Sequence, residues 1–492
     1  MNRDIFFTII IKDPPGNLRG MTVRISPEQD HLPGDRIKDL TEAARALPLA
    51  AHERLRTEML IAPPSGIAIR DLNGYLWADG SLNANRLVRH LENFRQGCVP
   101  HLFQPRVGMT IVMEEEFIGR EKPLADLETN IKGKRSCHLR APRRYGKSSL
   151  LERMTALLPQ AVMLELSDIG TPTGFLKVLV SRCMRNEAAR ACLHEIPVYR
   201  SWPEVANVAD VSQVFNKAFA DIMTSWNREL FSLLRDTMTA LADGEIVLLV
   251  DEFSLFLREM WDKNKPDLNT YLEIFHRLRT RSEKPLVSVF AGSAGLSTYI
   301  ELLGMHRLFD DLIPVDIPPV KKDEAKLLAE ELFYGMEKAP SPDAIKRLTE
   351  LTGGDETVPY FVHALAHYST EQAGRRREII VSDVEQAYYD RLLGAPGNVC
   401  FRDFILRERS YPNEYRAPAS RILKELSRQA PALIAEAGLR ELCGDACDFD
   451  KLMICLEEDY DLVRQGDEWR MRSRVIADRW RLGEPWLTMG GK

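Results

Sequence analysis

The residues from 141 to 149 carry the clearest chemical signal in the sequence. They read Ala-Pro-Arg-Arg-Tyr-Gly-Lys-Ser-Ser, the phosphate-binding pattern G-x-x-x-x-G-K-[ST] with alanine in place of the first glycine. Gly146 has no Cβ, so the backbone can bring its N–H groups close to phosphate oxygens. Lys147 is expected to reach the β- and γ-phosphates, and Ser148 offers a hydroxyl to Mg²⁺. The alternative is a chance Gly-Lys-Ser before an amphipathic helix.

The predicted phosphate-binding set covers the whole of this loop and its first helical residues. It consists of Ala141, Pro142, Arg143, Arg144, Tyr145, Gly146, Lys147, Ser148 and Ser149. The run that follows is typical of a helix, whose N-terminus would add a partial positive charge at the phosphates. Arg143 and Arg144 could contact phosphate or a partner, or form a solvated edge of the loop.

Two acids farther along the chain complete the pattern. The run 245–253 is a short apolar stretch that ends in Asp251 and Glu252, as expected for a buried parallel strand that delivers acids to its carboxyl edge. We expect Asp251 to hold Mg²⁺ together with Ser148, and Glu252 to orient or activate the attacking water. The alternative, a core strand before a solvated acidic turn, is weakened by the upstream Gly-Lys-Ser.

Several motifs in one order resemble those of prokaryotic ATPases in the AAA+/STAND group. Phe-Ile-Gly-Arg-Glu at 117–121 is similar to that group's F-x-G-R-E lead-in, and 143–148 is close to its P-R-R-x-G-K-[ST]. The segment 351–360 looks like its T-G-G-x-P motif near the adenine, with extra residues before the proline. The resemblance covers roughly residues 115–393 and continues more weakly to 480.

This resemblance implies further site residues and two ligands. ATP and Mg²⁺ are the implied cofactors, and Gly119, Arg120 and Pro359 join the implied nucleotide contacts. Ser293, at the end of the apolar run 285–293, stands where AAA+ ATPases place a polar side chain between the acids and the γ-phosphate. A turn serine is the alternative for Ser293. The implied catalytic set is Glu252, Lys147 and Ser293.

Two departures from the group's pattern bear on the activity. Ala141 replaces the first glycine of the loop, so a scaffold without ATPase activity is a third, weaker interpretation. Pro359 stands where many AAA+ proteins offer an arginine to the γ-phosphate. That favours a switch with slow turnover. Arg307, between two predicted strands, could serve as an arginine finger in cis or across a subunit interface, or be a surface arginine.

The elements that position these residues predict an α/β fold with four units. Strands alternate with helices across the central region, which indicates a parallel sheet covered by helices on both faces. We place an N-terminal α+β unit of unknown role at 1–112, a P-loop ATPase core at 113–318, a helical lid at 319–394 and a winged-helix-like unit at 395–492. In the N-terminal unit, strands are expected near 4–11, 21–25 and 66–76, and helices at 35–47 and 81–94.

The C-terminal unit raises the question of DNA. Its pattern is three helices and a hairpin, with arginines at 464, 470, 472, 474, 479 and 481. Clustered arginines can neutralise phosphates, but the third predicted helix ends in Glu457, Glu458 and Asp459, which suits a polyanion poorly. A partner-binding module is therefore favoured over a DNA-binding one. A nucleotide-dependent homo-oligomer is also consistent with this class.

Composition narrows the remaining classes. The chain has 492 residues, 45% hydrophobic and 28% charged, with a net charge of −6, which gives no global argument for nucleic acid. No apolar run is long enough to span a bilayer, and the first residues do not read as a signal peptide. The eight cysteines are scattered, and only Cys443 and Cys447 are close in sequence. We expect reduced thiols and a cytoplasmic protein.

These observations leave two main functions. The first is a nucleotide-driven switch of the AAA+/STAND type that hydrolyses ATP slowly and whose state is read by a protein partner through the N-terminal or winged-helix unit. Defence, signalling and regulation are roles that the resemblance implies. The second is a DNA-associated AAA+ ATPase of the replication-initiator or transposition-regulator type. Salt-sensitive binding to duplex DNA would separate the two.

Overall fold

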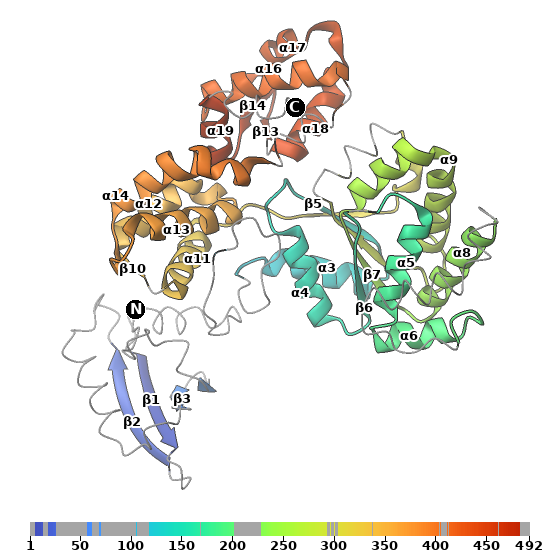
Figure 1. Ribbon diagram of the computed structural model, residues 1–492, viewed down its shortest axis with the longest axis horizontal. Helices are drawn as coiled ribbons and strands as arrows, with labels where there is room; N and C mark the ends of the chain where they lie inside the picture. The colour runs from blue at the N-terminus through green and yellow to red at the C-terminus, as the bar shows by residue number, and fades with distance from the viewer. Residues whose placement is uncertain are drawn as a thin grey trace.

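The computed structural model describes most of the chain beyond residue 117. It covers residues 5–12, 18–25, 57–61, 68–69, 105, 118–167, 169–200, 228–292, 296, 300, 304–336, 338–402, 404, 411, 413–460 and 462–482. Figure 1 shows a sheet-and-helix core, a bundle of helices beside it, and a C-terminal unit above that bundle. The predicted helices at 35–47 and 81–94, and the predicted linker at 104–112 apart from Pro105, lie outside the described residues.

The core is built on a five-stranded parallel sheet. Its order is β6 (Ala161–Glu165), β7 (Val247–Asp251), β8 (Ser288–Phe290), β5 (Cys137–Arg140) and β9 (Ile313–Asp316). Every residue of β7 is buried, because helices cover both faces of the sheet. The phosphate loop joins β5 to the following helix at the carboxyl edge. This is the α/β fold of P-loop NTPases, as the sequence predicted.

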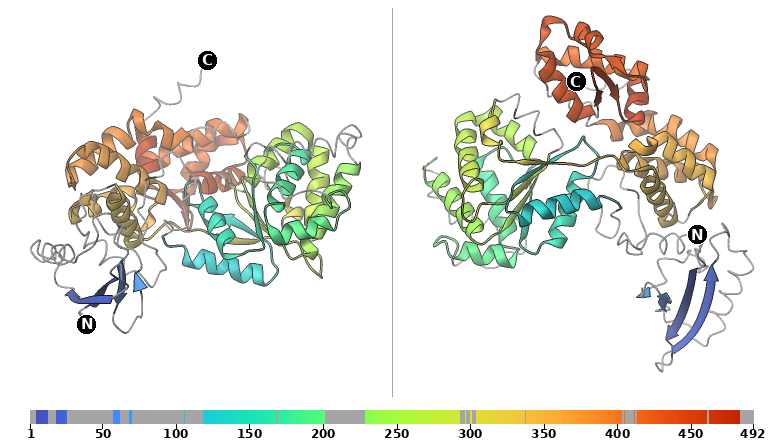
Figure 2. Two further views of the ribbon diagram at one scale, coloured as in Figure 1. Left: turned by 60° about the horizontal axis from the view of Figure 1, so that its bottom comes forward. Right: turned by 180° about the vertical axis from the view of Figure 1, so that it is seen from behind.

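Helices cover the two faces unequally. Helices α3 (Glu121–Lys132) and α4 (Lys147–Leu157) pack on one face. Helices α5 (Pro172–Cys183), α6 (Glu187–His194), α8 (Arg228–Asp243) and α9 (Phe253–Arg279) belong to the other (Figure 2). The sequence predicts a helix around 268–281. The structure confirms it as far as Arg279, but α9 begins earlier, directly after the acidic strand, and runs through Pro266.

The predicted lid is a bundle that follows β9. It contains α11 (Lys322–Gly335), α12 (Pro342–Thr352), the 3₁₀ turn η5 (Gly354–Glu356), α13 (Pro359–Ala373), α14 (Val381–Gln386) and the π-helical turn η6 (Ala387–Leu392). Two short strands, β10 (Ala339–Pro340) and β11 (Glu378–Ile379), pair in parallel. The sequence offers two helix caps in this bundle, Ser341 and Asp323. Ser341 does cap α12, by accepting from the Ala344 N–H, whereas the N-cap of α11 is Lys321 and Asp323 lies in its first turn.

The C-terminal unit contains the predicted three helices and hairpin. The helices are α16 (Asn413–Gln429), α17 (Glu436–Cys443) and α18 (Phe449–Tyr460), and the hairpin is β13 (Leu462–Gln465) with β14 (Glu468–Met471). Two elements were not predicted: β12 (Ile434–Ala435), which adds a third antiparallel strand, and α19 (Arg474–Arg481). Short 3₁₀ turns lie at His306–Leu308 (η4), Ala395–Gly397 (η7) and Gly444–Ala446 (η8).

Four strands are described in the N-terminal region. They are β1 (Ile5–Lys12), β2 (Leu18–Ile25), β3 (Thr57–Ile61) and β4 (Ala68–Ile69), in the antiparallel order β2-β1-β3-β4. The predicted pairing of the first two strands is confirmed, and the predicted extended stretch at 66–76 contains β4. The strand β3 was not predicted.

One hydrophobic core joins the lid to the C-terminal unit. Leu348 and Phe361 of the lid belong to the same buried cluster as Leu426 and Trp480 of the C-terminal unit. Tyr388 of the lid also donates a hydrogen bond to Asp478 on α19, over 2.7 Å. Arg470 of the hairpin makes two bonds to Glu356 of η5, over 2.8 and 2.6 Å. Because apolar burial is the main stabilising contribution in folding, the two units are expected to move as one body.

No helix in the described part of the chain combines the length and the apolar composition that crossing a bilayer requires.

Candidate functional site

The phosphate loop has the backbone that its motif requires. Gly146 is in the left-handed region, with φ of 89°, and α4 begins at the next residue. The N-terminus of α4 has no side-chain cap, so its first N–H groups are directed toward a site for an anion. The ammonium of Lys147 donates to the carbonyl oxygens of Ala141 and Pro142, over 2.6 and 2.9 Å. The lysine is therefore held within the loop, where a phosphate would compete for it.

Alanine in place of the first glycine does not distort the loop. Ala141 is absent from the residues with positive φ in the described chain, so a Cβ at this position carries no backbone penalty. Instead, Arg144 takes a left-handed conformation, with φ of 71°. For a residue with a Cβ this conformation costs roughly 1–2 kcal/mol. Something in the surroundings must offset that cost.

Two contacts fix Arg144 and its neighbour against the lid. The Arg144 guanidinium carbon lies 4.2 Å from the centre of the Tyr360 ring, which belongs to the first turn of α13. Tyr145 is 1% exposed and is part of the core shared by the lid and the C-terminal unit. An arginine over an aromatic ring is worth roughly 0.5–2 kcal/mol, comparable to the backbone cost at Arg144. The loop is thus attached to the lid by its side chains.

The two acids lie at the carboxyl end of β7, as predicted. Asp251 is 4% exposed and pairs in register with Glu165 of β6. Burial raises the pKa of Asp251, while a hydrogen bond with Ser148 and the charge of Lys147 oppose that rise. The Ser148 hydroxyl and the Asp251 carboxylate are hard oxygen ligands of the kind that Mg²⁺ binds, beside phosphate oxygens and water. The two predicted metal ligands are therefore brought together.

Glu252 is placed by an unusual turn. It has φ of 54° and precedes the first residue of α9, and its N–H donates to Asp251 Oδ1 over 2.9 Å. The next N–H, of Phe253, donates to the Ala291 carbonyl oxygen beyond β8, also over 2.9 Å. The first bond fixes the Asp251 carboxylate, and the second fixes the backbone at the start of α9. Glu252 is half-buried and directly follows the predicted metal ligand Asp251.

Arg120 forms the junction between the core and the lid. Its guanidinium donates to the carbonyl oxygens of Pro318, after β9, and of Tyr145, the latter over 3.1 Å. Burial lowers the pKa of Arg120 to about 10, and the nearby Glu324 carboxylate opposes that shift. Gly119 adopts φ of 73°, and a Cβ there would lie 3.0 Å from Glu324 Oε1. Glycine at 119 thus allows the lead-in to pass beside α11.

A pocket opens between the loop and the lid. Its core side is lined by Ile118, Arg120, Tyr145, Gly146 and Ser149, and its lid side by Val320, Glu324, Leu328, Pro359 and His363. Apolar side chains from both sides could enclose a flat base, with the loop at one end for phosphates. The structure thus places the predicted residues Arg120, Pro359 and Ser149 at one pocket.

Other predicted residues fall elsewhere. Ser293 lies outside the described residues, although β8 points toward the same edge of the sheet as β7. Arg307 is exposed on η4, next to Leu308, whose carbonyl oxygen accepts from the buried Arg279 over 2.6 Å. Arg279 also forms two bonds of 2.8 Å to Asp311. The turn that carries Arg307 is therefore well anchored.

Sequence reasoning missed most of the lid side of the pocket, where it had predicted Pro359 alone. Glu324 and His363 are far in sequence from the phosphate loop, and no motif marks them. The one available signal was the Lys-Lys-Asp-Glu start of α11, where Glu324 Oε2 accepts from the Lys321 N–H over 2.8 Å. That signal predicts a capping role and gives no hint of a pocket.

Replacing Arg120 by alanine is expected to destabilise the core–lid junction by roughly 3 kcal/mol, because two buried carbonyl oxygens lose a charged donor. The expected result is a lower midpoint of thermal unfolding. Differential scanning fluorimetry of the full chain would measure it. As a control, Arg235→Ala removes an arginine whose side chain is 59% exposed, and it should leave the midpoint unchanged. Equal midpoints for the two variants would contradict the junction role.

Comparisons with known proteins give structural neighbours only. No family model matches the chain, and no curated protein matches it. A Walker-type ATPase of Pyrococcus abyssi is similar, with a TM-score of 0.49, 17% identity, and coverage of 76% of this chain and 97% of that one. The Aeropyrum pernix ORC2 protein, in ADPNP–ADP complexes, has a TM-score of 0.46, 12% identity, and coverage of 77% and 96%.

The Thermotoga maritima RuvB Holliday junction branch migration motor is a third neighbour, with a TM-score of 0.37, 15% identity, and coverage of 74% and 95%. All three TM-scores lie below 0.5, so the fold assignment depends on the strand order and the phosphate loop described above.

Proposed function

We propose that this chain is an ATP-binding AAA+/STAND-type switch that hydrolyses Mg²⁺·ATP slowly and presents its nucleotide state to a protein partner. The observation that carries the proposal is the pocket formed jointly by the phosphate loop and the lid. A ligand bound there contacts both sides, so its loss changes the preferred position of the lid. In this proposal, residues 113–318 act as the ATPase core and 319–394 as the lid.

The roles within the site follow from its geometry. Lys147 and the N–H groups of the loop and of α4 bind the phosphates. Ser148 and Asp251 would hold Mg²⁺, whose charge would offset the negative charge that develops on the phosphates. Glu252 orients the attacking water and accepts its proton. Arg120, Pro359 and the apolar residues around them enclose the rest of the nucleotide.

Slow turnover is proposed because the lid offers no arginine at its pocket-lining turn. Pro359 lines the pocket there. Arg307 lies on an anchored, exposed turn. From there it could reach the nucleotide bound by a second copy of the chain. An arginine supplied across an interface would make hydrolysis depend on assembly. A nucleotide-dependent homo-oligomer is therefore part of the proposal.

The experiment that tests the proposal is a measurement of Mg²⁺·ATP binding and turnover by the purified full chain. Binding in the micromolar range with a turnover below about 1 s⁻¹ would support a switch, since typical enzymes reach roughly 10 s⁻¹. Absence of binding to the isolated chain would refute the proposal for the chain alone. Rapid turnover would refute the switch while leaving the ATPase in place.

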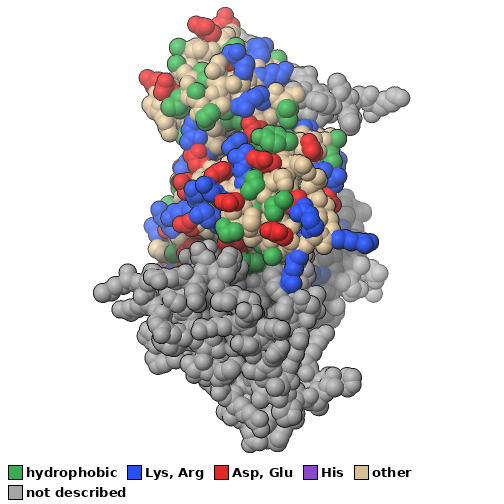
Figure 3. Space-filling model, turned by 90° about the vertical axis from the view of Figure 1, so that its left-hand side faces the viewer, with side chains coloured by type: hydrophobic (Ala, Val, Ile, Leu, Met, Phe, Trp, Pro, Cys, Tyr) green, Lys and Arg blue, Asp and Glu red, His purple; other side chains and the backbone are tan. Residues whose placement is uncertain are grey.

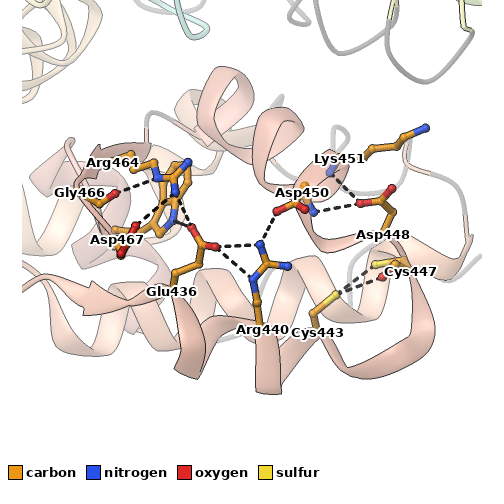
Figure 4. Close-up of polar contacts among 11 residues, drawn as sticks. Glu436, Arg440, Cys443, Cys447, Asp448, Asp450, Lys451, Arg464, Gly466 and Asp467 are labelled. Atoms are coloured by element: carbon orange, nitrogen blue, oxygen red, sulfur yellow. Dashed lines mark hydrogen bonds and ion pairs between the residues drawn. The ribbon is translucent and has the colours of Figure 1, made fainter.

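The alternative is a DNA-associated ATPase that uses the C-terminal unit as a winged helix. Its support was the run of arginines, and their contacts speak against it. Arg470 pairs with Glu356 of the lid, Arg464 pairs with Glu436 over 3.1 Å, and Arg479 donates to the Leu393 carbonyl oxygen. Glu436 also accepts from Arg440 (Figure 4). Arg470 and Arg464 are therefore already paired with carboxylates within the chain, and Arg479 is buried.

One face of the lid and the C-terminal unit is drawn in Figure 3. Over the lid, lysine and arginine side chains are interspersed with aspartate and glutamate, and a smaller group of basic side chains lies together on the C-terminal unit. A duplex would need a continuous basic surface to release counterions, and this face offers only that smaller group.

Duplex DNA is expected to bind only weakly and without a preferred sequence. The reason is that the hairpin arginines would have to leave Glu356 and Glu436 before they could contact phosphates. Fluorescence anisotropy with a labelled duplex of about 30 base pairs, between 50 and 200 mM salt, would measure this. Glu356→Gln, which frees Arg470, should strengthen the binding. Tight, salt-sensitive binding by the wild type would favour the DNA-associated function.

A further inference from the structure

We infer that Arg144 is a positioning residue that couples the phosphate loop to the lid through its contact with Tyr360. The inference rests on the proposed function, and it names the contact through which a change at the nucleotide site would reach the lid. Arg144 stands at a loop position that the phosphate-binding motif leaves unspecified. Its backbone there has a conformation that glycine usually adopts.

The first observation is the conformation of Arg144. Its φ of 71° lies in the region that residues with a Cβ rarely adopt. A strained residue persists only where its surroundings determine it, and such residues gather at functional sites. Here the surroundings are in the lid: the guanidinium carbon lies 4.2 Å from the centre of the Tyr360 ring.

The second observation is that the loop has further attachments on the same side. Tyr145 is buried in the core that the lid shares with the C-terminal unit. The Tyr145 carbonyl oxygen accepts from Arg120, which also holds the Pro318 carbonyl oxygen at the start of the connection from core to lid. Arg144 and Tyr145 therefore contact the lid through their side chains. The backbone of Tyr145 is also linked, through Arg120, to the connection from core to lid.

The third observation is the state of Lys147. Its ammonium is bonded to the carbonyl oxygens of Ala141 and Pro142, at the beginning of the same loop. A triphosphate would compete for this ammonium and draw N–H groups of the loop toward itself. Because Arg144 and Tyr145 follow within a few bonds, a change in the loop backbone must shift the Arg144–Tyr360 contact or move α13 with it.

Tyr360 lies in the first turn of α13, next to the pocket-lining Pro359 and on the same helix as His363. A displacement of Arg144 would thus move the residues that line the lid side of the nucleotide pocket. Since the lid shares its core with the C-terminal unit, the displacement would extend to α16 and α19. An arginine on α13 would link the phosphates to the lid directly. In this chain the Arg144–Tyr360 contact makes that link from the side of the loop.

The test uses four variants of the full chain. Tyr360→Leu removes the ring, and Tyr360→Phe keeps it. Arg144→Gly removes the guanidinium at a φ that glycine adopts freely, so the loop should fold. Phe449→Leu is the matched control, because it removes a ring 4.3 Å from Arg440 inside the C-terminal unit, away from the nucleotide site. Steady-state ATPase kinetics and amide hydrogen exchange over residues 359–373, in Mg²⁺·ATP and in Mg²⁺·ADP, are measured for each.

We expect Tyr360→Leu and Arg144→Gly to keep KM for ATP within about twofold and to lower kcat by about tenfold, as suits a lost arginine–ring contact. Both should also lose the difference in exchange between ATP and ADP across α13. Tyr360→Phe and Phe449→Leu should behave as the wild type. If the contact had a purely structural role, the two substitutions would change thermal stability and KM, and kcat would not fall while KM stays the same.

Several results would overturn the inference. The first is that both Tyr360→Leu and Arg144→Gly keep the wild-type kcat and the wild-type hydrogen exchange across α13. The second is that Tyr360→Phe is impaired as much as Tyr360→Leu. If the wild type itself fails to bind Mg²⁺·ATP, the proposed function fails first. If the wild type binds and hydrolyses ATP while the variants match it, only the coupling role fails.

Discussion

Replacing Lys147 by alanine is expected to weaken Mg²⁺·ATP binding by about 100-fold or more, because a charge-assisted bond to the phosphates is lost. The lysine is 8% exposed and its ammonium lies within the loop, so no neighbouring side chain can replace it easily. Titration with a fluorescent ATP analogue, supported by calorimetry, would give the two dissociation constants.

The same substitution tests the site assignment only if the protein stays folded. Lys147 is buried and donates to two carbonyl oxygens, so its loss should lower the unfolding midpoint, and the affinities are compared at a temperature well below that midpoint. Lys132→Ala is a suitable control, since this lysine is 72% exposed and its ion pair among the described residues is with Glu128 on its own helix. An affinity in Lys147→Ala equal to that of the control would mean that nucleotide binds elsewhere.

The sequence predicted the parts of the site that are written locally. The phosphate loop and the acidic strand are runs of consecutive residues, whose glycine, lysine and carboxylates have definite chemical purposes. The parallel sheet then brings the two runs together, because strands of a parallel sheet present their carboxyl ends at one edge. That is why the pairing of Ser148 with Asp251 could be predicted from the two motifs alone.

The contacts that attach the loop to the lid could not be predicted in this way. Arg120 reaches Pro318 across 198 positions, and Arg470 reaches Glu356 across 114. Such pairs depend on how separate units pack, and a single sequence carries no periodicity or motif for them. The basic character of the C-terminal arginines was likewise overestimated, because their acidic partners lie in other elements.

Helix α9 shows how packing can override a local signal. The sequence predicts a helix around 268–281, after Pro266, which lacks an N–H and is unfavourable inside a helix. The helix instead runs unbroken for 27 residues from Phe253. Phe256 and Met260 before the proline and Tyr271 after it are buried in the same core cluster. Burial on both sides of the proline offsets the cost of the missing bond.

Continuous helix α9 also matters for the acids, since it fixes the turn at its start. Glu252 lies at that turn in a left-handed conformation, with its N–H bonded to Asp251. Glutamine has nearly the same shape and keeps the same backbone preferences. Glu252→Gln should therefore preserve the turn, the metal ligands and the pocket, while it removes the group that accepts a proton.

The Glu252→Gln variant is accordingly expected to bind Mg²⁺·ATP within about threefold of the wild type and to hydrolyse it at least about 100-fold more slowly, the usual effect of losing a positioned base. Single-turnover hydrolysis and nucleotide titration on the same preparation would separate the two quantities. Glu259→Gln is the matched control, because Glu259 lies on the same helix, is 46% exposed and pairs with Lys263. If Glu252→Gln hydrolyses ATP at the rate of that control, Glu252 does not act as the base. Slow hydrolysis with retained binding would instead hold the chain in its ATP-bound state, which makes this variant the reagent for capturing the partner that reads that state.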